Sequence, residues 1–191
     1  MLIFTKMVSE KRKKIFEIIE VPNDVKAEIK NGIIKLSKDS LSLEKKLNYE
    51  PRIEGNKIIA EKENATKKDK KLIKTDMAHI RNLLRGLEKS YIYKLQICSV
   101  HFPISVNIVG NEVVIKNFLG ETKERKAKIL PNVSVKIEKD IIIVEGPDKE
   151  NVGQTASNIE QATRIKKRDR RIFQDGIFII SKEKGAGKKW L

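Results

Sequence analysis

The sequence VPNDVKAEIKNGIIKL, residues 21–36, alternates apolar and polar side chains on either side of an Asn31-Gly32 pair. An Asn-Gly pair between β-branched runs is typical of a tight β-hairpin turn. The sequence FPISVNIVGNEVVIKN, residues 102–117, repeats this pattern around Gly110-Asn111, and a proline stands second in both stretches. Two such similar hairpins, one in each half of the chain, predict that one small unit occurs twice.

The two halves continue in the same order after these hairpins. A further pair of short strands is predicted at RIEGNKIIAEK, residues 52–62, and at SVKIEKDIIIVEG, residues 134–146, because a polar turn divides Ile-rich runs in each. Apolar residues then recur every three or four positions, which is typical of one face of a helix. These residues are Ile73, Met77, Ile80, Leu84 and Leu87 in the first half, and Val152, Ala156, Ile159 and Ala162 in the second.

We therefore predict an α+β fold, a tandem duplication of a small antiparallel sheet with one helix packed on a face, plus a basic C-terminal tail. Residues 1–14 would form a basic N-terminal extension, residues 15–90 the first repeat, residues 91–180 the second repeat, and residues 181–191 the C-terminal basic tail. The apolar segment 87–100 would connect the repeats as a long strand.

The charge of the chain limits its partners. Its 191 residues include 41 Lys and Arg but only 26 Asp and Glu, a formal net charge of +15. Such an excess favours a dense polyanion, nucleic acid before an anionic membrane, and the alternative is a basic protein that is merely soluble. The sequence has no window of about 18–20 apolar residues that would predict a membrane span. The single cysteine, Cys98, suits a reducing compartment, so we expect a soluble, intracellular protein.

Two regions concentrate the positive charge. Six of the eight residues from Arg164 to Arg171 are Lys or Arg, and Phe173 and Phe178 follow. Burial of an unpaired charge is prohibitive, so this run is expected to face water or a polyanion. We interpret Phe173 as an apolar plug that returns the chain to the domain, with a base-stacking platform as the alternative. In the first half, cations crowd the predicted helix at Lys67, Lys68, Lys70, Lys71, Lys74, Arg81 and Arg85.

The sequence contains no pattern that indicates catalysis. His79 and His101 are the only histidines, and without a third ligand or a cysteine pair they do not predict a zinc site. We expect His101 to form a local hydrogen bond instead. The phosphate-binding pattern GxxxxGK[ST] and the nucleophile pattern GxSxG are both absent. We therefore expect that the chain is not an enzyme and that it uses no metal and no cofactor.

Two stretches of the second half are similar to a known family. YKLQICSVHFPISVNIVGNEVVIKNFLGE, residues 93–121, and IEQATRIKKRDRRIFQDGIFIISKEKG, residues 159–185, resemble the universal sixth protein of the large ribosomal subunit in its eukaryotic and archaeal branch (the ninth protein of the eukaryotic subunit). The specific resemblance covers residues 91–185, while the first half resembles the family in its duplicated architecture. The chain departs from the family at residues 37–40, Ser-Lys-Asp-Ser, where a Gly-Pro-x-Gly turn is usual.

The resemblance implies a structural constituent of the cytosolic large ribosomal subunit, which binds and braces large-subunit rRNA near the factor-binding site. Neighbouring large-subunit proteins, including those at the stalk base, would be further partners, whereas a membrane and a small-molecule substrate would not. The chain would be cytoplasmic, and nucleolar during assembly if it is eukaryotic. The basic regions and the family's contacts together give the expected RNA-binding residues, which are Lys67, Lys68, Lys71, Arg81, Arg85, Lys166, Lys167, Arg168, Arg170, Arg171, Lys182 and Lys184. Phe173, Asp175 and Gly176 would shape the turn before the tail.

Two other functions compete with this interpretation. A free RNA-binding ribosome-assembly factor could have the same duplicated fold. An RNA-modifying enzyme is disfavoured. Such an enzyme needs general acid and base residues, and the sequence shows no group of residues that would supply them.

Overall fold

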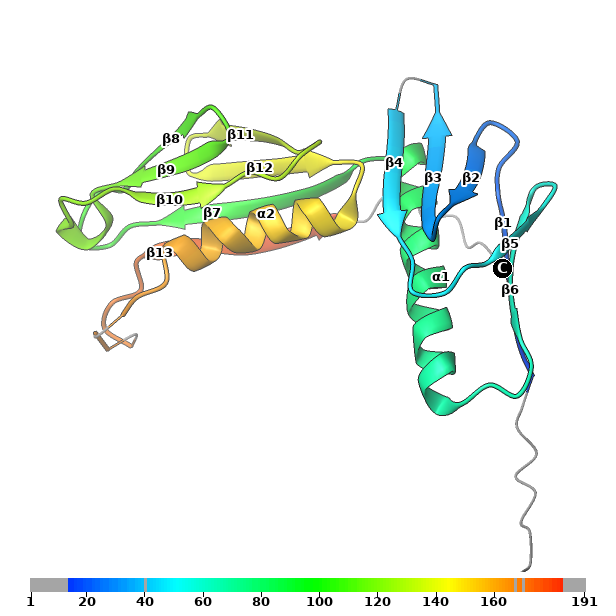
Figure 1. The fold of residues 1–191 in the computed structure, drawn as a ribbon. Helices are drawn as coiled ribbons and strands as arrows, with labels where there is room; N and C mark the ends of the chain where they lie inside the picture. The colour runs from blue at the N-terminus through cyan, green and yellow to red at the C-terminus, as the bar shows by residue number, and fades with distance from the viewer. Residues whose placement is uncertain (1–13, 40, 167, 170, 184–191) are drawn as a thin grey trace, which may run out of the picture. The chain divides into compact units, whose positions relative to one another are not determined.

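The computed structural model describes residues 14–39, 41–166, 168–169 and 171–183 (Figure 1). The chain forms two compact units, which divide between Arg81 and Asn82 within a long helix. The repeat limits 15–90 and 91–180 stay a prediction, since this division falls inside the helix that was assigned to the first repeat. Both units contain small antiparallel sheets, and a helix accompanies them in each half of the chain. The α+β class expected from the sequence is therefore confirmed.

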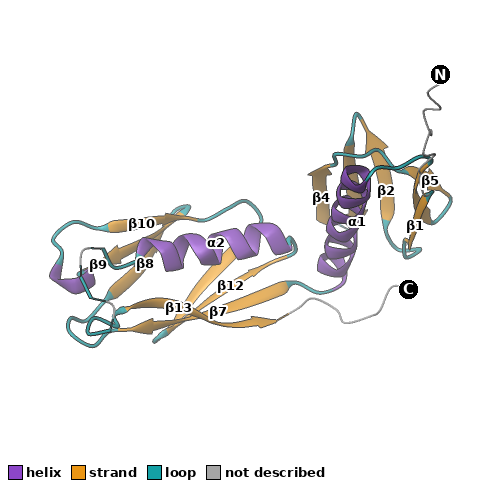
Figure 2. Ribbon diagram, turned by 90° about the horizontal axis from the view of Figure 1, so that it is seen from below, coloured by secondary structure: helices purple, strands orange, loops and turns teal. Residues whose placement is uncertain are grey.

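The first unit combines two three-stranded antiparallel sheets with helix α1 (Lys67–Glu88). One sheet has the order β2-β3-β4 and consists of β2 (Lys26–Lys30), β3 (Ile33–Lys38) and β4 (Leu41–Lys46). The other has the order β1-β6-β5 and consists of β1 (Ile15–Glu20), β6 (Lys57–Lys62) and β5 (Arg52–Glu54). In both ribbon views α1 lies across one face of the first sheet (Figures 1 and 2).

Local sequence explains the form of this unit. Asn31 and Gly32 have φ values of 53° and 72°, which place both residues in the left-handed region that a type I′ hairpin turn requires. In β3, Ile34 and Leu36 have no exposed surface, because every second residue of a strand faces the core. The apolar stripe predicted on α1 is buried as well, at Ile73, Met77, Ile80, Leu84 and Leu87.

The second unit combines a four-stranded antiparallel sheet, a three-stranded antiparallel sheet and helix α2 (Lys149–Ala162). The larger sheet has the order β11-β12-β7-β13 and consists of β11 (Ser134–Glu138), β12 (Ile141–Gly146), β7 (Tyr91–Cys98) and β13 (Gly176–Glu183). The smaller has the order β10-β9-β8 and consists of β10 (Arg125–Lys128), β9 (Glu112–Lys116) and β8 (Ser105–Val109). A short 3₁₀ turn, η1 (Phe118–Gly120), separates β9 from β10.

Helix α2 closes the core of this unit by packing on β7, β12 and β13 of one sheet and on β10 of the other (Figure 2). Val152, Ala156 and Ile159 of α2 are fully buried in a cluster that includes Leu95 and Ile142. Strand β7, expected only as a connection, lies inside the larger sheet between β12 and β13. No helix among the described residues is both long and apolar enough to cross a membrane.

Several strands were not anticipated from the sequence. Strand β10 has the sequence RKAK and β4 the sequence LSLEKK, so neither shows a clear apolar alternation. Their positions are instead set by pairing with β9 and β3. Strand β13 continues to Glu183, which is beyond the limit of 180 expected for the second repeat.

Candidate nucleic-acid interface

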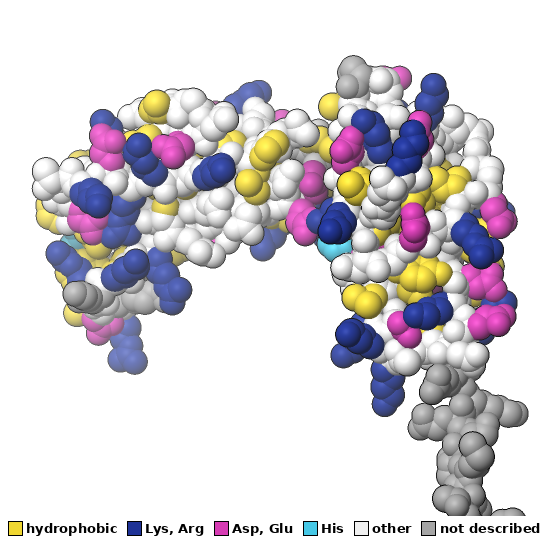
Figure 3. All heavy atoms as spheres, viewed as in Figure 1, with side chains coloured by type: hydrophobic (Ala, Val, Ile, Leu, Met, Phe, Trp, Pro, Cys, Tyr) yellow, Lys and Arg dark blue, Asp and Glu magenta, His cyan; other side chains and the backbone are white. Residues whose placement is uncertain are grey.

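Residues 163–175 connect α2 to β13, and we call this segment the basic loop. Arg164, Lys166, Arg168 and Arg171 are exposed there. None of these four forms an ion pair with another described residue, whereas Lys167 and Arg170 lie outside the described residues. Figure 3 shows Lys and Arg side chains gathered at this end of the second unit, at the lower left. The basic loop therefore presents cations whose charge the protein itself leaves largely uncompensated.

Arg125 of β10 holds the start of the basic loop. Its guanidinium donates hydrogen bonds to the carbonyl oxygens of Ala162 at 2.8 Å and Arg164 at 3.2 Å. Carbonyls at the end of a helix lack donors within the helix, so Arg125 caps the C-terminal end of α2. It also lies over the Phe118 ring, 4.3 Å from the centroid. A planar guanidinium with five donors can make all these contacts at once, which a lysine could not.

Glu121 fixes the orientation of Arg125. Its two carboxylate oxygens accept hydrogen bonds from Arg125 at 2.7 and 2.8 Å. These bonds hold the pKa of Glu121 below its usual value, and the charge of Arg168 lowers that pKa further. Arg125 was not among the residues predicted to bind RNA, although it lies four residues after Glu121, where the first stretch that resembles the family ends.

Asp175 holds the other end of the basic loop, and only 1% of its surface is exposed. Its Oδ1 accepts hydrogen bonds from the backbone N–H groups of Val100 at 2.6 Å and His101 at 2.9 Å. Its Oδ2 lies 2.6 Å from Nδ1 of His101. Burial alone would raise the pKa of Asp175, but the hydrogen bonds from His101 and Val100 outweigh burial and lower it. The carboxylate therefore ties the loop to the segment that follows β7.

The expectation of a local hydrogen bond for His101 was wrong. Its partner Asp175 is 74 residues away in the sequence. Spacing along the chain could not reveal this pair, because the two segments meet only when β13 pairs with β7 and Gly176 comes opposite Cys98.

Phe173 is partly buried and packs against the core cluster of the second unit. Its ring lies 4.8 Å from the His101 ring on a tilt of 32°. The guanidinium of Arg168 lies 4.8 Å from the same ring centroid. These contacts agree with Phe173 as an apolar plug that holds Arg168 in place by a cation–π contact.

Further hydrogen bonds shape the rest of the basic loop. Thr163 is buried, and its hydroxyl oxygen accepts from the backbone N–H of Ile177 at 2.9 Å. The Asp169 carboxylate accepts from the backbone N–H of Arg171 at 2.9 Å, and this bond between residues two apart forms a local turn. The Phe178 ring lies against Gly176, so a Cβ there would come to 2.9 Å from the ring and would require the ring to shift. The loop thus leaves α2 and enters β13 along a path fixed at both ends.

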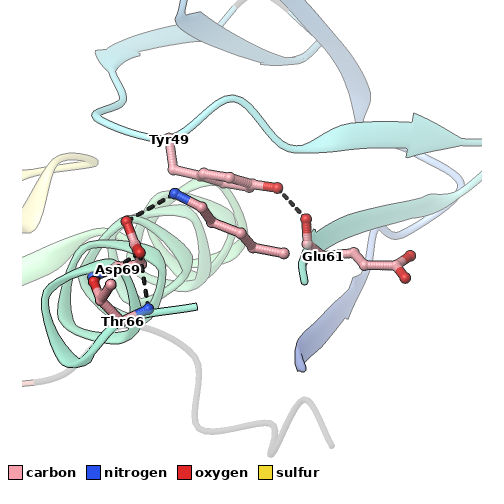
Figure 4. A network of polar contacts seen from close by, with 5 residues as sticks. Tyr49, Glu61, Thr66 and Asp69 are labelled. Atoms are coloured by element: carbon pink, nitrogen blue, oxygen red, sulfur yellow. Dashed lines mark hydrogen bonds and ion pairs between the residues drawn. The ribbon is translucent and has the colours of Figure 1, made fainter. Parts of the chain in front are cut away.

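The start of α1 carries the second cluster of cations. Lys67, Lys68 and Lys71 are exposed and form no ion pair among the described residues, and the same holds for Lys70 and Lys74. Thr66 and Asp69 form a reciprocal cap, in which Asp69 accepts from the Thr66 backbone N–H at 2.9 Å and Thr66 Oγ1 accepts from that of Asp69 at 3.2 Å (Figure 4).

Lys62 of β6 supports the same cap. It donates to Asp69 at 2.8 Å, and this bond with those from Thr66 lowers the pKa of Asp69 well below its usual range (Figure 4). Tyr49 donates its hydroxyl to the backbone carbonyl of Glu61 beside this pair. Hydrogen bonds from Lys62 and Thr66 to Asp69 thus hold the start of the helix, from which the exposed lysines project.

Arg81 and Arg85 of α1, both expected to bind RNA, interact with the protein or are partly buried in it. Arg81 forms an ion pair with Glu17 of β1 at 3.1 Å, so a carboxylate already compensates its charge. The Nε atom of Arg85 is buried and has no hydrogen-bond partner within the part of the chain that the structure describes. Lys182 of β13 is exposed, and its Nζ lies 5.8 Å from the Tyr93 ring centroid, whereas Lys184 lies outside the described residues. Within the described part of the chain, no group of three or more His, Cys, Asp and Glu residues could hold a metal ion.

The chain is similar in sequence to proteins of the ribosome. Residues 102–176 match the family model described as Ribosomal protein L6. A protein of Methanococcus vannielii is 41% identical to the chain over 177 residues, which cover 91% of this chain and 96% of that protein. The chain belongs to the ribosomal protein L6 family. A Saccharolobus solfataricus relative is 43% identical over 171 residues, 87% of this chain and 94% of that protein, and like the first it is named large ribosomal subunit protein uL6.

Membership in the L6 family confirms the resemblance seen in the sequence. A third relative of the same name, from Ignicoccus hospitalis, is 41% identical over 88% of this chain and 95% of its own length. The similarity therefore extends well beyond the second half, where the recognisable sequence motifs lie. L6 proteins are structural parts of the ribosome, which agrees with the expectation that the chain is not an enzyme.

Proposed function

We propose that this protein binds and braces large-subunit rRNA as a structural constituent of the large ribosomal subunit, through its basic loop and the start of α1. Its place among L6 proteins, which belong to the large ribosomal subunit, supports the coarser part of this proposal. The finer part, direct contact with rRNA, rests on the two cation clusters.

The observation that carries the proposal is the contrast between compensated and uncompensated cations. On the β2-β3-β4 sheet, Lys35 is paired with Glu44 at 2.8 Å and Lys30 with Glu28 at 3.3 Å. In the basic loop, by contrast, Lys166 and Arg171 are exposed without a carboxylate partner among the described residues. Phosphates would neutralise such cations, and release of the counterions held by the RNA would drive binding.

A salt titration with paired variants tests this proposal. Binding of the full chain to a large-subunit rRNA transcript is measured at increasing salt for the wild type and for Lys166→Ala/Arg171→Ala. Each lost phosphate contact should reduce the slope of log K against log salt by about 0.7–0.9, so the double variant should lose up to two such steps. The control Lys30→Ala/Lys35→Ala removes the same charge from paired lysines and should leave the slope nearly unchanged. Equal losses in both double variants would mean that net charge alone attracts the RNA.

The place of the protein in the subunit is part of the same proposal. We infer that it lies on the factor-binding side, with neighbouring ribosomal proteins at the stalk base as further partners. The cytoplasmic ribosome would be its site of action, and in a eukaryotic cell assembly would take place in the nucleolus. A free assembly factor with the same fold is the competing function. Co-sedimentation with large subunits at high salt supports the constituent, and loss into the free pool supports the factor.

A further inference from the structure

A groove of about 860 Å³ runs along the inner side of the basic loop. It lies at the open edge of the larger sheet, where β13 is the last strand and the end of α2 comes close. Its apolar lining comes from Cys98, Val100, Ile165, Phe173 and Phe178, and its polar lining from Glu160, Gln161, Thr163, Arg164, Gln174 and Asp175. The groove is large enough for a small organic ligand, since such sites occupy about 300–1,000 Å³.

Phe178 gives the groove an accessible aromatic wall, because 42% of its surface is exposed. Phenylalanine is usually buried, so an exposed ring in a groove is more informative than one in a core. The ring also lies against Gly176, where a Cβ would approach it to 2.9 Å, so its position is restricted on that side. An aromatic face of this kind can stack on any base, because every base has a π-face.

The polar lining suits the edge of a base. Gln161 donates through its amide nitrogen to the Ser157 hydroxyl at 3.1 Å, and Gln174 donates to the Arg171 carbonyl at 3.4 Å. Each amide keeps a second N–H and a carbonyl oxygen. Base edges present donors and acceptors together, and an amide can match both. The groove therefore combines a stacking surface with adaptable hydrogen-bonding groups.

Cations outnumber carboxylates around the rim of the groove, and Asp169 is the one acidic residue among the exposed side chains of the basic loop that the structure describes. Arg164 lines the groove itself, and Lys166, Arg168 and Arg171 follow in the same loop, exposed and without ion pairs to other described residues. Both carboxylates of the groove bond to the protein, since Glu160 accepts from the Ile179 backbone N–H at 3.1 Å and the buried Asp175 accepts from the backbone N–H groups of Val100 and His101. A polyanion complements this rim, whereas an apolar protein segment would leave the cations unmatched.

We propose that the groove takes the base of one unpaired, unstacked nucleotide of RNA, with the flanking phosphates on the cations of the basic loop. This inference rests on the proposed RNA binding and adds a preference for extruded bases over continuous helix. A base within a helix has both faces covered by its neighbours, so only an unstacked base can lie against Phe178.

Two RNA hairpins test the inference with the full chain. One carries a single bulged 2-aminopurine nucleotide in its stem, and the other is identical without the bulge. The wild type should bind the bulged hairpin about ten-fold more tightly, because stacking of one base on an aromatic ring contributes about that factor or more. The fluorescence of 2-aminopurine should fall on binding, since stacking quenches it.

Two substitutions separate stacking from packing. Phe178→Leu keeps an apolar side chain of similar size and should abolish both the preference and the quenching. Phe178→Tyr keeps the ring and should retain both. Retained preference in Phe178→Leu, or no preference in the wild type, would overturn the inference while leaving the proposed function intact. Failure of the wild type to bind either hairpin or the rRNA transcript would instead overturn the proposed function.

Discussion

Asp175→Asn provides a sharp test of how the basic loop is held. The substitution keeps the shape of the side chain but removes its charge. The Asn oxygen can still accept from the backbone N–H groups of Val100 and His101, which both bond to one oxygen of Asp175 at 2.6 and 2.9 Å. A hydrogen bond to a charged acceptor contributes about 1.5–3 kcal/mol and a neutral one about 0.5–1.5. The loss over the two bonds should therefore be about 2 kcal/mol of unfolding free energy.

Asp169→Asn is the matched control. Asp169 lies in the same loop, and its carboxylate is exposed and accepts from one backbone N–H, that of Arg171 at 2.9 Å. The control changes the net charge by the same amount and should shift stability by no more than about 0.5 kcal/mol. Urea unfolding followed by circular dichroism at neutral pH measures both variants. Equal stability of the two variants would refute the role assigned to Asp175.

We expect Asp175→Asn and Asp169→Asn to change RNA binding in different directions. Each variant removes one negative charge next to the cations, so simple electrostatics would strengthen both. Asp169→Asn should bind RNA as well as the wild type or slightly better. Asp175→Asn should bind more weakly, because a loop no longer fixed at its end must be ordered on binding. A filter-binding assay with one rRNA transcript distinguishes these outcomes.

The pH dependence of stability follows from the lowered pKa of Asp175. A carboxyl group whose pKa is lower in the folded protein stabilises the fold above its unfolded pKa of about 3.9. That contribution disappears as the pH falls through the lower, folded-state pKa. The stability difference between wild type and Asp175→Asn should therefore be constant near neutral pH and shrink below about pH 4. A difference that stayed constant into strong acid would contradict the assignment.

Two further predictions concern other contacts. Arg125→Lys should lower the free energy of unfolding by about 2 kcal/mol, because a lysine cannot cap α2 and pair with Glu121 at the same time. The control Lys126→Ala removes an exposed cation of the same strand and should lower it by less than about 0.5 kcal/mol in the same unfolding assay. Equal losses would contradict the cap. Gly86→Ala would bring a Cβ to 1.8 Å from the Pro147 carbonyl oxygen and should cost about 2–3 kcal/mol. The control is Gly153→Ala, where the atom nearest to a Cβ would be 3.7 Å away, and it should be neutral or stabilising by up to about 1 kcal/mol. A similar loss of stability in Gly86→Ala and Gly153→Ala would mean that close packing at Gly86 does not cause the loss.

The sequence predicted those parts of the fold that depend on local pattern. The hairpin at Asn31-Gly32 and the helix stripe from Ile73 to Leu87 were both found, because turn geometry and one-sided burial leave a periodic trace in the sequence. The pattern failed for β4 and β10. These strands have few apolar residues and are positioned by their neighbours instead of by their own sequence.

The sequence likewise predicted some features of the candidate site and missed others. The sequence by itself determined that a basic run follows the second helix, that an aromatic residue ends it, and which family the chain resembles. It also marked Arg81 as an RNA contact, but the tertiary structure pairs that residue with Glu17, 64 residues away.

Only the tertiary structure decided which residues hold the basic loop. Asp175 meets Val100 across 75 residues, and Arg125 reaches the Ala162 carbonyl across 37. The physical reason lies in the range of the two kinds of interaction. Burial of one side of a strand or helix repeats with the backbone period, so it can be read along the chain. A hydrogen bond between distant segments depends on strand register and sheet order, which exist only after the chain has folded.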